Sequence, residues 1–193
     1  LENIAHEAFC YCSSLESFMI PANVETVGVM AFSNCSNISK LRFYCKNVGN
    51  WFSSSKNKVE EILIGNSVET IGSAFESFSS LTNLQFEDGS SLKEIKRYAF
   101  HDCDALKEVD LPEALETLGN VAFYSCGKLE TIKLPKTLKA IHDNAFIDCP
   151  ALKDVYAYIP KPFGIDASVF SSTTYKNAVL HVNGVAEKFR KRF

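Results

Sequence analysis

The feature that most constrains this chain is an internal repeat of about 23 residues. Seven copies can be aligned from their first apolar residue, and the steps between them are 23, 24, 20, 24, 23 and 23 residues. The copies begin at Leu1, Val24, Val48, Val68, Leu92, Leu115 and Leu138. A period of this length is typical of proteins in which one small structural unit stacks on the next. We therefore expect residues 1–193 to form a single repeat domain, a solenoid of about eight coils.

The most regular copies share the pattern L-x-x-I-x-x-x-A-F-x-x-C-x-x-L-x-x-I-x-L-P. Leu115 to Pro135 follows this pattern with Leu118 in the place of the first isoleucine, and the next copy, from Leu138, repeats it almost letter for letter. The phenylalanine is recognisable in eight copies. They are Phe9, Phe32, Phe52, Phe75, Phe100, Phe123, Phe146 and Phe170. Agreement at so many positions excludes a chance repeat.

The pattern predicts two extended segments and one turn per coil. The L-x-x-I-x-L segment alternates apolar and polar residues at its end, which indicates a strand with one buried face. Strands from successive coils must run parallel, and their inward side chains form the core. A second apolar pair, such as Leu115 and Leu118, predicts a short strand or extended arc on the opposite side. The A-F step is too short for a full helix, which favours a turn or a single helical twist.

The two ends of the chain differ. Val185, Phe189 and Phe193 recur every four residues, with basic residues between them, which predicts an amphipathic helix. We expect residues 180–193 to cap the last coil, because an uncovered coil exposes strand edges. Leu1 already occupies a repeat position, so we expect the chain to be truncated from a longer protein at its N-terminus.

The A-F-x-x-C-x-x-L-x-x-I-x-L-P strings at residues 8–21, 99–112 and 122–135 resemble the BspA-like, Treponema-type leucine-rich-repeat surface proteins. Together the pattern and the resemblance predict a leucine-rich-repeat solenoid: a right-handed coil with a parallel β-sheet on one face, short turns or 3-10/helical twists on the other, and a C-terminal capping helix. The resemblance implies a secreted or cell-surface location and adhesion to extracellular or cell-surface proteins. The chain begins at Leu1 and not at a Met followed by a basic and an apolar stretch, so we expect any signal or anchor to lie outside it.

Some positions depart from the pattern. In coil three Trp51 takes the alanine position and a serine run replaces the cysteine, and in coil four Phe78 stands in the cysteine position, so we expect these coils to bulge or bend. Five cysteines share one repeat position: Cys12, Cys35, Cys103, Cys126 and Cys149. Their spacing matches the coil rather than a C-x-x-C ligand pair, which favours buried packing over a metal ladder. Cys10 and Cys45 lie outside that column, as exposed thiols or ordinary surface residues.

The sequence gives little support to other kinds of site. Twenty Lys and Arg against 23 Asp and Glu leave a net charge of -3, which argues against nucleic acid as a partner. No run of 18 apolar residues predicts a membrane span. His101, Asp102 and Cys103 are adjacent in a turn, and adjacent residues seldom converge as nucleophile and base, so we interpret them as structural. We expect no metal, no cofactor and no small-molecule substrate.

Three functions remain, and the outward side of the strands separates the first two. The chain is a non-enzymatic binding module, a spacer or stalk without its own ligand, or, with the least support, an enzyme acting on glycans or peptides. A binder should show aromatic and apolar groups among charges on this side, whereas a spacer should repeat small polar residues. The candidate protein-binding residues are Met19, Arg42, Tyr44, Leu63, Gln85, Asp110, Lys133, Tyr156 and Tyr158.

Overall fold

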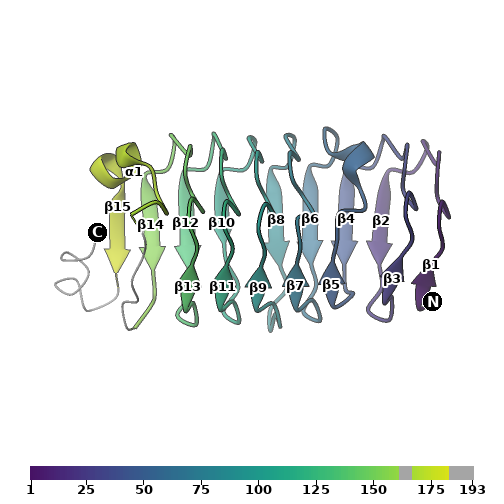
Figure 1. Ribbon diagram of the computed structural model, residues 1–193, viewed down its shortest axis with the longest axis horizontal. Helices are drawn as coiled ribbons and strands as arrows, with labels where there is room; N and C mark the ends of the chain where they lie inside the picture. The colour runs from purple at the N-terminus through teal and green to yellow at the C-terminus, as the bar shows by residue number, and fades with distance from the viewer. Residues whose placement is uncertain (161–166, 183–193) are drawn as a thin grey trace.

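The computed structural model describes residues 1–160 and 167–182, which form a solenoid with two rows of parallel strands (Figure 1). The longer strands line one side, called here the front face: β2 (Ser17–Ile20), β4 (Lys40–Phe43), β6 (Glu61–Ile64), β8 (Asn83–Phe86), β10 (Glu108–Asp110), β12 (Thr131–Leu134), β14 (Asp154–Ala157) and β15 (Val179–Val182). Two-residue strands line the opposite side, the back face: β1 (Asn3–Ile4), β3 (Thr26–Val27), β5 (Asn47–Val48), β7 (Thr70–Ile71), β9 (Glu94–Ile95), β11 (Thr117–Leu118) and β13 (Ala140–Ile141). The predicted solenoid of about eight coils is confirmed.

The strands pair without offset, so equivalent residues of successive coils lie side by side. On the front face Thr131 pairs with Asp154 and Leu134 with Ala157. Ile132 and Leu134 of β12 are buried while Thr131 and Lys133 are partly exposed, as the period of two predicts. The inward side chains of all coils join in one continuous apolar core. Each coil is therefore stabilised mainly by its two neighbours.

The repeated phenylalanines stack on one another through the interior. The ring centroids of Phe100 and Phe123 lie 5.1 Å apart with 10° between the ring planes, and those of Phe123 and Phe146 lie 5.6 Å apart with 7° between them. Phe146 and Phe170 continue the row at 5.2 Å. Phe123 and Phe146 are fully buried. The eight-fold phenylalanine pattern thus corresponds to one aromatic column, in which Phe43 bridges Phe52 and Phe75 with ring centroids 5.9 Å and 5.4 Å away.

The A-F segment of a regular coil is a turn and not a helical twist. In coil six Val121 and Ser125 have φ values of 52° and 55°. The N–H groups of Val121, Phe123 and Ser125 donate to carbonyls of coil seven at 2.9 to 3.0 Å. Neighbouring turns are therefore hydrogen-bonded to each other, as the strands are. Helix among the described residues is limited to the 3-10 helix η1 (Ser53–Ser55) and to α1 (Ser172–Asn177).

Four of the five column cysteines are buried as predicted, and the fifth is not. The thiols of Cys103, Cys126 and Cys149 donate to phenylalanine carbonyls of the preceding coil at 3.1 to 3.3 Å, and that of Cys35 does so at 3.0 Å. Cys12 is exposed, so its predicted burial was wrong. Unlike the other four thiols of the column, that of Cys12 has no phenylalanine carbonyl partner among the described residues.

The two cysteines outside the column also differ from each other. Cys45 is only 1% exposed, so interpreting it as a surface residue was wrong. It follows β4 at the corner of the coil, where its thiol points inward and donates to the Asn47 carbonyl at 3.5 Å. Burial raises the pKa of Cys45 to about 11. Cys10 is half-buried.

Coils three and four keep their stacking despite their departures from the pattern. Ser55 of η1 occupies the cysteine position, is buried, and donates its hydroxyl to the Cys35 carbonyl, as the cysteines do to theirs. Phe78 is buried edge-on against Phe75 at 5.4 Å. Strands β4, β6 and β8 remain paired through both coils. The departure in coil three takes the form of the 3-10 helix η1, and the front sheet divides after coil four, between β8 and β10.

The last described coil ends in β15, which pairs with β14. Ser171 caps α1 by accepting the Thr174 N–H at 3.1 Å. Of the expected cap at 180–193, residues 180–182 are the end of β15, and residues 183–193 lie outside the described part of the chain. No helix within residues 1–160 and 167–182 is long and apolar enough to cross a membrane.

Candidate protein-binding face

The front face brings seven of the nine predicted residues into two straight columns. In the first, Met19 pairs with Arg42, Arg42 with Leu63, and Leu63 with Gln85. In the second, Asp110 pairs with Lys133, Lys133 with Tyr156, and Tyr156 with His181. Tyr44 and Tyr158 directly follow β4 and β14. The columns are separated where β8 and β10 are not paired.

The first column combines apolar and charged groups. The side chain of Met19 is apolar, yet 52% of it is exposed on the outward side of the strand. Arg42 is exposed beside it, and the neighbouring outward position holds an ion pair between Lys40 and Glu61 at 3.1 Å. Small polar residues are therefore not repeated monotonously along these strands.

Tyr44 is held in place rather than free on the surface. Its ring lies over Gly65, where a Cβ atom would come within 2.3 Å of the ring carbon Cδ1. Its hydroxyl donates to Oε1 of Glu87 at 2.9 Å, two coils further along the chain. This hydrogen bond, and then partial burial, raise the pKa of Tyr44. Tyr44 therefore fixes Glu87 and contributes only part of its ring to the face.

The second column is fixed by contacts between adjacent strands. The Lys133 Nζ atom lies 2.9 Å from Oδ2 of Asp110 and 3.2 Å from Oε1 of Glu108, and hydrogen bonds to these two carboxylates raise its pKa. The Tyr156 ring stacks on the His181 ring at 4.2 Å with 9° between the planes. Tyr158 is 36% exposed. This half of the face is thus a pre-arranged surface of two tyrosines and one bridged lysine.

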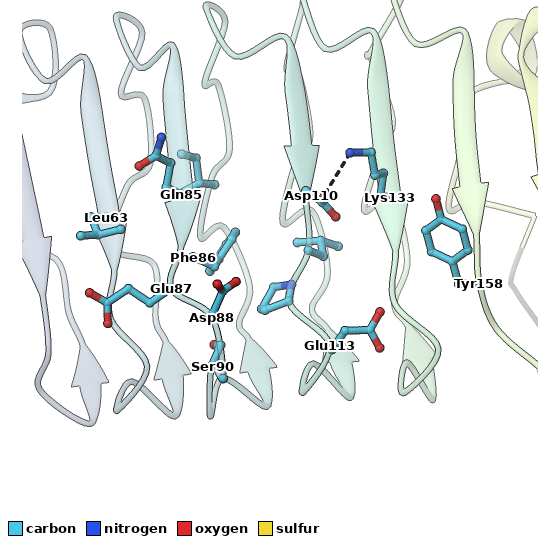
Figure 2. A pocket seen from close by; sticks show the side chains of 14 residues that line it. Leu63, Gln85, Phe86, Glu87, Asp88, Ser90, Asp110, Glu113, Lys133 and Tyr158 are labelled. Carbon is cyan, nitrogen blue, oxygen red and sulfur yellow. Dashed lines mark hydrogen bonds and ion pairs between the residues drawn. The ribbon is translucent and has the colours of Figure 1, made fainter.

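A cleft of about 720 Å³ opens between the two columns, and the sequence reasoning did not predict it. Figure 2 shows Phe86 and Asp88 between β8 and β10, with Asp110 and Glu113 across the opening. Five residues, 87–91, connect the core positions Phe86 and Leu92, whereas three connect Leu111 and Leu115. This longer loop was the available sequence signal. Gly89 supports its turn with a φ of 70°.

The adjacent residues His101, Asp102 and Cys103 do not converge on one point. The His101 Nδ1 atom lies 3.1 Å from Oδ2 of Asp102 on the turn. The Cys103 sulfur is buried in the core, where burial strongly raises its pKa and its thiol donates to the Phe75 carbonyl. Within residues 1–160 and 167–182, no three His, Cys, Asp or Glu side chains gather as possible metal ligands.

Comparisons with known proteins agree with this architecture. The sequence profile described as BspA type leucine rich repeat region matches residues 2–89 and 72–185, with six copies of its repeat. No curated protein matches the chain. A leucine-rich-repeat protein from T. pallidum is similar in structure, with a TM-score of 0.61 and 24% identity, over 94% of this chain and 73% of that one. A leucine-rich-repeat protein from Bacteroides ovatus ATCC 8483 gives 0.58 and 23%, over 94% and 57%.

Proposed function

Since the chain belongs to the BspA-type leucine-rich-repeat family, we propose that it is a non-enzymatic binding module that recognises extracellular or cell-surface proteins with its front face. Such repeats generally serve as scaffolds that present an extended surface to another macromolecule. The proposal includes a secreted or surface-displayed location. It also includes a single domain over residues 1–193.

The observation that carries the proposal is the composition of the outward columns. Tyr156 and Tyr158 stand beside Lys133, and Met19 and Leu63 stand beside Arg42. Tyrosine, methionine and arginine are enriched in protein interfaces, because they bury a large area with few rotatable bonds or form several hydrogen bonds. A face of this kind supports a binder over a spacer.

Paired variants of the front face test the proposal. Tyr156→Ala/Tyr158→Ala and Met19→Ala/Arg42→Ala would be purified beside the unaltered chain. Binding to a panel of extracellular-matrix proteins and to whole cells would be measured by biolayer interferometry and flow cytometry. Truncating interface hot spots costs 2 kcal/mol or more, so we expect at least one variant to bind about thirtyfold more weakly.

Tyr11→Ala is the matched control, because Tyr11 is 75% exposed but lies on the turn side of coil one. The control should bind like the unaltered chain, and thermal melting should show that all variants remain folded. Unchanged binding in both front-face variants would contradict a front-face site. Absence of any bound partner for the unaltered chain would favour the spacer.

A further inference from the structure

We propose that the cleft between β8 and β10 is a recognition site for an extended, arginine-containing segment of a partner protein. This inference rests on the proposed binding function and adds the site and the chemistry of the ligand. The cleft lies between two strands that face each other without pairing, in a sheet whose other neighbours are paired throughout the described residues. Figure 1 shows this wider separation on the front face between β8 and β10.

Phe86 supplies an apolar floor that the two neighbouring coils do not offer. The equivalent residues of the neighbouring strands, Ile64 and Leu111, are 0% and 3% exposed. Phe86 is half-buried, because the separation of β8 from β10 uncovers one side of its ring. An exposed aromatic face next to negative charge favours the stem and the planar cation of an arginine side chain.

The lining of the cleft is complementary to a cation. It contains the four carboxylates of Glu87, Asp88, Asp110 and Glu113 and the single ammonium group of Lys133. Asp88 is exposed and has no hydrogen-bond or ion-pair partner among residues 1–160 and 167–182. Lys133 pairs with Asp110 at 2.9 Å and Lys136 pairs with Glu113 at 3.5 Å, so the net negative charge of the lining comes from Glu87 and Asp88.

Two of these carboxylates are held in fixed positions. The Tyr44 hydroxyl at 2.9 Å and the Asn66 N–H at 3.1 Å both donate to Glu87. Asp110 is fixed by Lys133 at 2.9 Å (Figure 2). A guanidinium group entering the cleft would meet carboxylates that are already ordered, so binding costs less conformational entropy of these side chains.

The unpaired edges of β8 and β10 are the reason for proposing a ligand with an extended backbone. Because β8 and β10 do not pair, their facing edges leave N–H and C=O groups free of sheet hydrogen bonds. An extended segment can bond to such edges through its main chain while one side chain enters the cleft. The combination selects a peptide segment rather than a free cation.

The probe is the peptide acetyl-Gly-Thr-Val-Arg-Val-Thr-Gly-amide, titrated into the ¹⁵N-labelled chain and followed by amide chemical shifts. We expect the largest shifts at residues 86–90 and 108–113 and none along the back face. A peptide with citrulline in place of arginine has the same shape without the charge, and it should bind at least about tenfold more weakly. Methylating the backbone nitrogens on either side of the arginine should also weaken binding.

Asp88→Asn removes one cleft charge without breaking a contact of the folded chain. One partly exposed ion pair contributes up to about 1 kcal/mol, so the variant should bind the peptide about two- to fivefold more weakly. Glu25→Gln is the control, because Glu25 is exposed in coil two and its side chain has no partner among the described residues. Phe86→Leu keeps an apolar side chain but removes the aromatic face, and it should weaken binding without lowering the melting temperature by more than a few degrees.

Equal binding of the arginine and citrulline peptides, or shifts centred on Met19 and Arg42, which lie outside the cleft lining, would overturn the cleft proposal. So would unchanged affinity of Asp88→Asn. None of these results affects the broader function, which depends on capture of whole proteins by the front face. Conversely, a peptide that binds in the cleft while both front-face variants retain their protein partners would support the cleft and contradict the front-face columns.

Discussion

Truncation of Phe123 to alanine should destabilise the solenoid far more than the same change at Phe9. Phe123 is fully buried and stacks on both neighbours in the column, at 5.1 Å from Phe100 and 5.6 Å from Phe146. Removal of a fully buried phenylalanine side chain costs about 3–5 kcal/mol. Phe9 is half-buried and has one neighbour in the column, Phe32 at 5.3 Å, so about half that loss is expected, roughly 1.5–2.5 kcal/mol.

Urea melts at 25 °C, followed by far-ultraviolet circular dichroism, measure both losses in the free energy of unfolding. Amide hydrogen exchange adds a spatial readout: Phe9→Ala should lower protection in the first two coils, whereas Phe123→Ala should lower it in coils five to seven. Equal losses at the two positions, or equal loss of protection along the chain, would refute the view that each coil is stabilised chiefly by its neighbours.

Three further predictions concern thiols and backbone positions. A chromogenic thiol reagent at pH 8 should react rapidly with only Cys10 and Cys12 and with all seven cysteines after denaturation, and five or more fast thiols would contradict the buried column. Gly65→Ala should cost about 1–3 kcal/mol in urea melts because the tyrosine ring above it leaves no room, while the control Gly72→Ala, whose Cβ would lie 3.2 Å from its nearest neighbour, should cost less. Val121→Asn places a residue that tolerates left-handed backbone at a φ of 52°, and it should raise the melting temperature by roughly 1–3 °C; a fall would show that packing of the valine outweighs the strain.

The regular part of the fold could be predicted because its signals are local and repeated. The alternation Thr131, Ile132, Lys133, Leu134 identifies the buried face of one strand, and the constant step places each residue beside its counterpart. The same reasoning predicts the outward columns of the front face. These inferences require only the pattern within a coil and the distance to the next copy.

The errors lie where a residue depends on something outside its own copy. Cys12 has the consensus position but is exposed, because burial of the other column thiols requires a carbonyl from another coil, and Cys12 has none among the described residues. Cys45 lies at a corner whose inward direction is not set by the period of two. The link from Tyr44 to Glu87 joins residues 43 positions apart, with no repeat unit that contains both. The sequence pattern within one coil carries no information about contacts between residues of different coils.

The position of the cleft follows from what still holds coils four and five together. Their back strands remain paired, with Thr70 opposite Glu94 and Ile71 opposite Ile95. Phe75 stacks on Phe100 at 5.3 Å, so the aromatic column is also continuous there. Separation of the front strands therefore removes the hydrogen bonds between β8 and β10 and leaves Phe86 half-buried, while the back strands and the phenylalanine column keep their contacts. Because the back sheet and the phenylalanine column hold coils four and five together, the longer loop in coil four can open a cleft without dividing the solenoid. A departure from the repeat at such a position is expected to have a functional reason.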